Sequence, residues 1–78
     1  MNKKDSVQVR FGCAVRQRRY ELGLSQEDLA GKAGLHRTYI SDIERGARNP
    51  SLEVIERLAI SLDLRVAELF SSYGFDKL

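Results

Sequence analysis

The sequence predicts an all-α protein of five short helices. Apolar residues recur three and four positions apart along most of the chain, and serine or glycine stands where helical stretches begin or end. No segment shows the alternation of apolar and polar residues that is typical of a strand. The chain is expected to form one small domain, 1–78, with a core over about 6–71 and a loose tail over 72–78, from which Tyr73 or Phe75 can fold back.

The first helix is expected from about Ser6 to Leu22. Gly12 interrupts its pattern and Gly23 terminates it. Five apolar side chains of this helix are predicted to face the core: Val7, Phe11, Ala14, Val15 and Leu22. Cys13 lies off this stripe, so we predict a passive surface thiol, and a single cysteine excludes a disulfide within the chain.

Residues 26–45 are predicted to form a helix-turn-helix, two short helices that cross at a tight corner. Ser25 is a good N-cap, with Asp28 three positions later in the capping-box arrangement, so the first of the two helices begins at about Gln26. Gly34 ends this helix, because glycine adopts the left-handed conformation of a sharp turn at little steric cost.

The second helix of the corner runs from about Arg37 to Arg45 and stops at Gly46. Leu35 is expected to fill the corner, and Ala30 to lie where the two backbones approach most closely. Successive helical residues are about 100° apart, which groups five polar side chains on one side: Arg37, Thr38, Ser41, Asp42 and Arg45. The other side holds Tyr39, Ile40 and Ile43, with Glu44 at the boundary. Such a face is often only solvated, but a corner of this kind typically presents its second helix to a DNA groove.

The fourth helix is expected from about Leu52 to Leu62, entered through Pro50 and capped by Ser51. Its predicted inward residues are Leu52, Ile55, Leu58, Ala59 and Leu62. A fifth helix over about 66–71 carries three apolar side chains: Val66, Leu69 and Phe70. These three exceed what so short a helix can bury, so we predict that they form a dimer interface; the alternative is that they close the core of one chain.

Charge and composition narrow the function classes. Residues 1–48 carry ten Lys or Arg and six Asp or Glu, a balance of +4 against +2 for the whole chain, so the basic half is the half that holds the corner. One histidine, His36, is too few for a zinc site, and no metal or other cofactor is expected. No nucleophile–base pair supports an enzyme. With no membrane-spanning apolar run and no signal peptide, the chain is expected in the cytoplasm and off the membrane.

Five landmarks follow one another in order: VRQRR at 15–19, GLSQEDLA at 23–30, AGL at 33–35, ISDIERG at 40–46 and RNPSLE at 48–53. With them, residues 11–70 resemble the helix-turn-helix domain of the Xre/Cro family of phage-repressor-like regulators. The run HRTYISDIERGARN is most similar to the controller proteins of restriction-modification systems, although many chromosomal regulators of the family read similarly. The resemblance implies a five-helix, lambda repressor-like fold.

The resemblance implies base contacts from Arg37, Thr38 and Asp42, and a phosphate contact from Gln26 at the start of its helix. Ser41 shares the base-reading face. Position around the second helix and its two ends adds further phosphate contacts: His36, Tyr39, Arg45, Arg48 and Asn49. Tyr39 has an alternative role, packing inward against the first helix. The resemblance also pairs Arg19 with Glu44 as a structural ion pair.

These residues predict a sequence-specific transcription regulator that binds double-stranded DNA as a homodimer. Two recognition helices would enter successive major grooves, about 34 Å apart, on a palindromic operator. The protein would block RNA polymerase or recruit it, at its own promoter if it is an autoregulatory controller protein. The alternative is an antitoxin-type or adaptor protein whose main target is a protein partner.

Overall fold

Five helices make up the described part of the chain, which comprises residues 6–71 and 73 of the computed structural model. They are α1 (Val7–Glu21), α2 (Gln26–Ala33), α3 (Arg37–Glu44), α4 (Leu52–Ser61) and α5 (Val66–Ser71). No strand occurs within those residues. The predicted all-α class with five helices is therefore confirmed.

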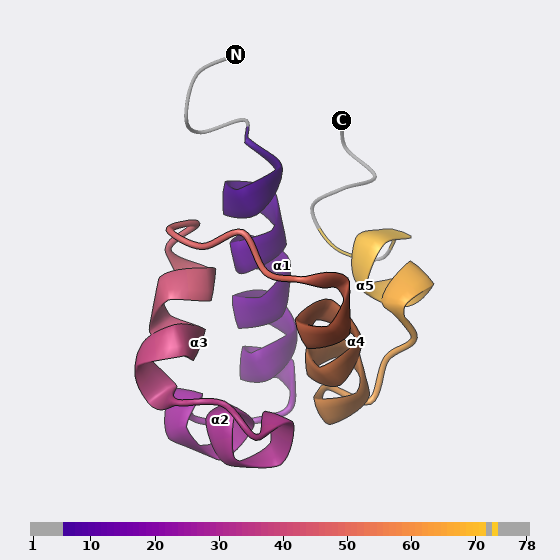
Figure 1. The fold of residues 1–78 in the computed structure, drawn as a ribbon. Helices are drawn as coiled ribbons and strands as arrows, with labels where there is room; N and C mark the ends of the chain where they lie inside the picture. Colours follow the sequence, from indigo (N-terminus) through magenta and orange to yellow (C-terminus); the bar gives the residue numbers. More distant parts are fainter. Residues whose placement is uncertain (1–5, 72, 74–78) are drawn as a thin grey trace.

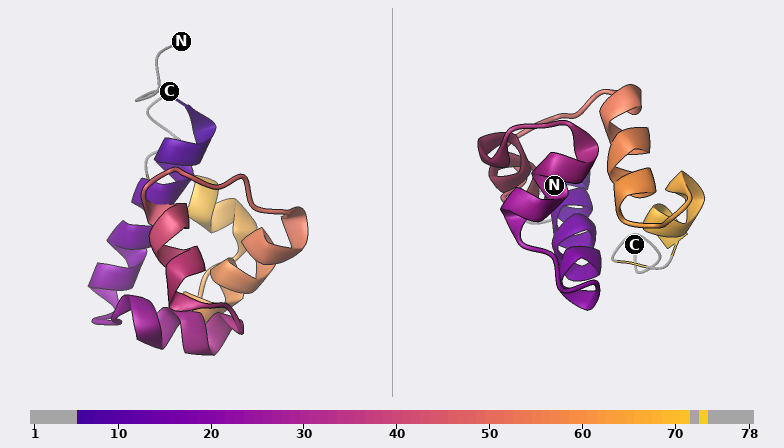
Figure 2. Two further views of the ribbon diagram at one scale, coloured as in Figure 1. Left: turned by 60° about the vertical axis from the view of Figure 1, so that its left-hand side comes forward. Right: turned by 90° about the horizontal axis from the view of Figure 1, so that it is seen from below.

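Helix α1 is the central element of the fold. In Figure 1 it runs down the middle of the molecule, with α3 on its left, α4 on its right and α2 across its lower end. The views in Figure 2 place α5 beside α4, on the far side of the molecule from α3. The core lies where α1 packs against α3 and α5, and where α2 packs against α3 and α4. This arrangement leaves the outer side of α3 uncovered by any other described helix.

Serine side chains cap three helices, and the caps of α2 and α4 are those that the sequence predicts. The hydroxyls of Ser6, Ser25 and Ser51 each accept a hydrogen bond from a backbone N–H three residues later. At Ser25 the capping box is complete, because Asp28 Oδ2 also accepts from the Ser25 N–H at 3.0 Å. This backbone hydrogen bond lowers the pKa of the Asp28 carboxyl. The caps fix where α1, α2 and α4 begin.

Gly12 does not interrupt α1, contrary to the prediction. The helix is continuous from Val7 to Glu21, and Gly12 is buried against α3. A Cβ atom at this position would overlap the carbonyl oxygen of Ile43 and lie 2.9 Å from that of Glu44. The glycine therefore sets the separation of α1 and α3. Ala30, predicted to lie where the two helices of the corner approach most closely, is buried.

The core consists largely of the residues that helical spacing predicts. Seven large side chains are fully buried: Val15, Leu29, Ile40, Ile43, Leu58, Leu62 and Leu69. Two predicted core residues are wrong: Val7 is 53% exposed and Leu52 is 85% exposed. Each is the first residue of its helix, where the chain enters from outside the packed layers. Helical periodicity identifies the apolar side of a helix but does not show how far along its length that side is covered.

Two arginines bind the carbonyl groups that helix ends leave unpaired. Arg57 on α4 donates from Nε to the Ala33 oxygen at 3.1 Å and from Nη2 to the Gly34 oxygen at 2.9 Å. Arg18 on α1 donates from Nε to the Leu62 oxygen at 2.9 Å. The last carbonyls of a helix have no partner within it, so these contacts satisfy groups at the ends of α2 and α4. They also tie α1 and α2 to α4.

Tyr73 folds back onto α1, which is the alternative that the sequence left open for the tail. Its side chain is buried, and its hydroxyl donates to Glu21 Oε1 at 2.5 Å. Burial raises the pKa of Tyr73, and the same hydrogen bond lowers the pKa of the Glu21 carboxyl. The predicted loose tail is wrong at Tyr73. Residues 72 and 74–78, Phe75 among them, lie outside the described part.

Candidate nucleic-acid interface

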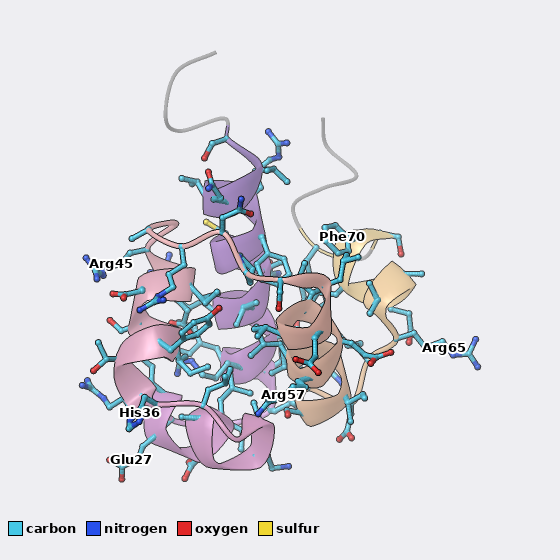
Figure 3. The ribbon with its side chains drawn as sticks, in the orientation of Figure 1. Glu27, His36, Arg45, Arg57, Arg65 and Phe70 are labelled. Carbon is cyan, nitrogen blue, oxygen red and sulfur yellow. The ribbon has the colours of Figure 1, made fainter. Side chains whose placement is uncertain are left out.

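The corner between α2 and α3 is built around Gly34. This residue has φ 68° and ψ 36°, and its N–H donates to the Ala30 oxygen. The next N–H, of Leu35, donates to the same oxygen at 2.9 Å, and the Leu35 side chain packs against the core. The two carbonyl contacts from Arg57 hold the turn from the other side. Figure 3 shows Arg57 reaching from α4 toward this turn. The direction in which α3 leaves the corner is thus fixed by the left-handed conformation of Gly34, by the two hydrogen bonds to the Ala30 oxygen and by Arg57 of α4.

Helix α3 has one buried face and one open face. Ile40 and Ile43 are buried, which anchors the helix in the core. Arg37 and Thr38 are exposed on its first turn, and Ser41 and Asp42 are partly exposed one turn later. His36 and Arg45 lie at the two ends of α3 on the outer side of the molecule in Figure 3. The predicted base-contact residues therefore share one accessible surface, with two predicted phosphate contacts at its ends.

Glu44 does not lie at the open boundary of α3 but is buried, as is Arg19 opposite it. Arg19 donates from Nε to Glu44 Oε2 at 2.6 Å and from Nη2 to Oε1 at 2.8 Å. Its remaining nitrogen, Nη1, donates to the Leu24 oxygen at 2.9 Å. The hydrogen bonds to Glu44 raise the pKa of the Arg19 guanidinium. This bidentate pair joins α1 to α3.

Gln26, the first residue of α2, is attached to the same carboxylate. Its Nε2 donates to Glu44 Oε1 at 3.1 Å, and the side chain is partly buried. Glu44 therefore receives hydrogen bonds from α1 and from α2 while belonging to α3. The first N–H groups of a helix lack intrahelical partners. The anchored amide of Gln26 therefore lies beside N–H groups that can donate hydrogen bonds to an anion.

A second polar group, which we call the arginine cluster, extends from α3 to the loop that follows it. Its members are Tyr39, Asp42, Arg45 and Arg48. One carboxylate oxygen of Asp42 accepts from Arg45 Nη2 and the other from Arg48 Nε at 3.4 Å. The Arg48 guanidinium lies 4.4 Å from the centre of the Tyr39 ring, a cation–π contact. Tyr39 also packs against the core, which is the inward role that the sequence left as an alternative. Its ring thus contacts the core and the Arg48 guanidinium.

The predicted dimer interface is wrong at Leu69. This side chain is fully buried within its own chain, where α5 packs against α1 and α4, so it offers no surface to a second copy. Phe70 is partly buried, with its ring stacked on Phe11 at 5.8 Å between centroids. Val66 is 38% exposed, and Ile60 at the end of α4 is 66% exposed. The sequence did not single out Ile60.

Arg57 and Gly12 are the other residues that the sequence did not single out. Arg57 stands 23 residues after Gly34, and nothing in the local pattern of α4 indicates what it binds. Gly12 did carry a signal, because a glycine within a helical pattern often marks close approach to another backbone. Both residues act by setting the position of α3.

Metal binding and membrane insertion find no support in residues 6–71 and 73. No three His, Cys, Asp or Glu side chains among them are grouped as a metal site. Within the same residues, no helix has the length and apolar character needed to cross a bilayer. Cys13 is exposed, as predicted. The candidate site is the exposed polar surface of α2 and α3, which carries Arg37 and Thr38.

Comparison with known proteins agrees with this geometry. A family model described as helix-turn-helix matches residues 15–69. Control protein C.BamHI of Bacillus amyloliquefaciens is 47% identical over 73 residues, which cover 90% of each chain. The crystal structure of the restriction-modification controller protein C.AhdI from Aeromonas hydrophila has a TM-score of 0.79 and 49% identity, covering 81% of this chain and 96% of that one.

A further solved structure contains DNA. It is the restriction-modification controller protein C.Esp1396I, a tetramer in complex with its natural 35 base-pair operator. It matches with a TM-score of 0.80 and 35% identity over 87% of this chain and 91% of that one. The family resemblance seen in the sequence is confirmed by these matches. The chain belongs to the helix-turn-helix family of regulators, in the group that contains control proteins such as C.BamHI.

Proposed function

We propose that this protein is a sequence-specific regulator of transcription that binds double-stranded DNA as a homodimer on a palindromic operator. The observation that carries the proposal is the open face of α3, with exposed Arg37 and Thr38 on its first turn, beside the anchored amide of Gln26. A helix-turn-helix places these parts against base edges and against the flanking phosphates. The protein acts by binding alone, without catalysis, in the cytoplasm.

Sequence is read from the first turns of α3. The Arg37 guanidinium can donate two hydrogen bonds to guanine O6 and N7, and Thr38 can contact a thymine methyl group. Ser41 and Asp42 follow one turn later on the same surface. We assign base contacts to Arg37, Thr38 and Ser41. The resemblance implies a base contact from Asp42 as well, but both of its carboxylate oxygens accept hydrogen bonds from arginines.

Affinity comes mainly from phosphates. Gln26 and the N–H groups at the start of α2 bind one side of the groove, where the positive end of the helix dipole favours an anion. The other contacts surround α3: His36, Tyr39, Arg45, Arg48 and Asn49. Such contacts fix the position of the protein on the duplex but carry no sequence information.

The similarity to C.BamHI and C.AhdI supports an autoregulatory controller protein, whose operator lies upstream of its own gene. Depending on where that operator stands, the protein blocks RNA polymerase or recruits it. An adaptor that acts through a protein partner would not need the open face of α3 for its main task. Failure of the parent protein to bind DNA from upstream of its own gene would favour the adaptor.

Replacing Arg37 with alanine is expected to remove sequence preference. Loss of one bidentate base contact costs about 1 to 3 kcal/mol of discrimination, so the ratio of operator to non-operator affinity falls about 5- to 150-fold per half-site. Gel shifts with DNA from upstream of the protein's own gene, against a scrambled duplex, measure this ratio. Gln26→Ala should weaken binding to both duplexes alike.

Arg65→Ala is the matched control for Arg37→Ala. Arg65 is also exposed and carries the same charge, but it lies on the opposite side of the molecule from His36 and α3 in Figure 3. Its loss should leave the affinity ratio unchanged. Full discrimination by the Arg37→Ala protein would show that the reading face has been assigned to the wrong residues.

Replacing Ile60 with lysine is expected to weaken the homodimer. Ile60 and Val66 are exposed apolar side chains on α4 and α5. Figure 2 places α5 on the far side of the molecule from α3, so a second copy bound there would leave both recognition helices free. A lysine there loses apolar contact and must be desolvated, so the dimer dissociation constant should rise at least about tenfold, or about 1.4 kcal/mol. Sedimentation velocity over a concentration series measures the change.

The control for that measurement is Leu52→Lys, the same kind of change at another exposed apolar residue of α4. It should leave the monomer–dimer equilibrium as it is. An unchanged dimer in the Ile60→Lys protein, with the parent fold kept, would place the interface elsewhere.

A further inference from the structure

Two arginines of the arginine cluster are paired with a carboxylate of the same chain, at the place where the proposed function needs phosphate contacts. Asp42 engages Arg45 with one carboxylate oxygen and Arg48 with the other. The two arginine side chains are 64% and 46% exposed, whereas the Asp42 side chain is only 20% exposed. A partly covered carboxylate thus holds two exposed cations beside the open face of α3. The geometry is that of two arginines sharing one phosphate-like anion.

Stability of the helix does not explain the aspartate. Asp42 lies in the last turn of α3, at the negative end of the helix dipole, where an acidic side chain is unfavourable. Exposed ion pairs contribute little to folding, and Asp42–Arg45 and Asp42–Arg48 are of that kind. An asparagine would keep a similar shape with less conflict with the dipole. The cost of an aspartate here calls for a reason outside folding.

We propose that Asp42 acts as an internal substitute for phosphate, which lowers the affinity of the protein for DNA of any sequence and so weakens its binding to non-operator DNA. The proposal rests on the DNA-binding function proposed above. Together, Arg45, Arg48 and Asp42 present a net charge of +1 to the duplex, whereas the two arginines alone would present +2. Asp42 is hydrogen-bonded to both arginines. A phosphate that contacts the arginines is therefore well within a Debye length of the carboxylate, and salt screens their repulsion only in part.

The penalty is the same on every DNA sequence, so it lowers operator and non-operator affinity by the same factor. Non-specific binding depends almost wholly on phosphate contacts, so losing one contact removes a large part of its free energy. Operator binding retains the base contacts of Arg37 and Thr38 and can bear the loss. An aspartate beside the phosphate-binding arginines therefore weakens binding to non-operator DNA while leaving the ratio of the two affinities unchanged.

The test is Asp42→Asn in the full chain, with binding measured on operator and scrambled duplexes between 50 and 200 mM salt. Removing the carboxylate adds one effective phosphate contact, so the slope of log K against log salt should steepen by about 0.9. Over that fourfold rise in salt, binding should weaken by an additional factor of about 3.5. At the lowest salt, both duplexes should be bound more tightly than by the parent, with the operator-to-scrambled ratio unchanged.

Glu56→Gln is the matched control, because Glu56 is an exposed acid on α4 and the substitution changes the net charge equally. Its slope should equal that of the parent. A second comparison tests the mechanism: in an Arg45→Ala, Arg48→Ala background, Asp42→Asn should no longer alter the slope. Persistence of the effect there would assign it to general charge and overturn the proposal.

The outcomes separate this inference from the proposed function. Failure of the parent to bind either duplex would reject DNA binding itself. Parent binding with an unchanged slope in Asp42→Asn, or an equal change in Glu56→Gln, would reject the internal substitute and leave DNA binding intact. Weaker operator binding by Asp42→Asn, with scrambled binding unchanged, would make Asp42 a base contact, which also overturns the inference.

Discussion

Replacing Glu44 with alanine lowers the free energy of unfolding by about 3 to 5 kcal/mol, because the Arg19 guanidinium then stays buried without its counter-ion. A domain of this size has a total stability of about 4 to 12 kcal/mol, so the variant is expected to lose much of its folded population. Urea denaturation and thermal melting followed by circular dichroism measure the loss. DNA binding should fail at temperatures where the variant unfolds and should partly persist below them.

A double replacement separates the charge from the packing. In an Arg19→Met, Glu44→Leu protein neither charge is left alone, and most of the lost stability should return, since apolar substitutes for a buried ion pair are often neutral or better. Gln26 would still lack the Glu44 oxygen that holds its amide. DNA affinity should therefore stay below that of the parent although stability recovers. Equal melting temperatures for Glu44→Ala and the parent would contradict the structural role of the pair.

The helices were predictable because their signals are local. Ser6, Ser25 and Ser51 accept hydrogen bonds from N–H groups three residues away, and Gly34 has the positive φ that its place in the turn requires. Side chains spaced along one helix face lie on one side whatever the rest of the fold. Such features need only the residues within one or two turns, which the sequence supplies directly.

Contacts between helices could not be read in the same way. The bond from Arg57 to Gly34 and the bond from Arg18 to Leu62 span 23 and 44 residues, and nothing local specifies either partner. The exposure of Leu52 depends on where α4 begins relative to the other helices, and the burial of Leu69 depends on how α5 packs against α1 and α4. The spacing of apolar residues encodes neither. The burial of Glu44 likewise depends on the distance between α1 and α3.

Gly12→Ala should destabilise the protein, although alanine is the better helix former, because Gly12 sets the distance between α1 and α3. The new methyl group would overlap the Ile43 carbonyl and crowd that of Glu44, and both are backbone atoms that no change of side-chain rotamer can move. Overpacking of this kind costs about 1 to 3 kcal/mol, and more where the neighbours cannot yield. The cost must also exceed the gain of up to about 1 kcal/mol that alanine brings to a helix.

Gly31→Ala gives the opposite sign from the same chemical change. Gly31 lies within α2, it is exposed, and no atom stands within 4 Å of where its Cβ would be. Only the helix propensity remains, so stability should rise by up to about 1 kcal/mol and the melting temperature by about 4 to 8 °C. Thermal melts of the two variants test the pair directly. A stabilised Gly12→Ala protein would mean that α1 and α3 can separate freely, and then neither the Arg19–Glu44 pair nor the placement of α3 could depend on their close approach.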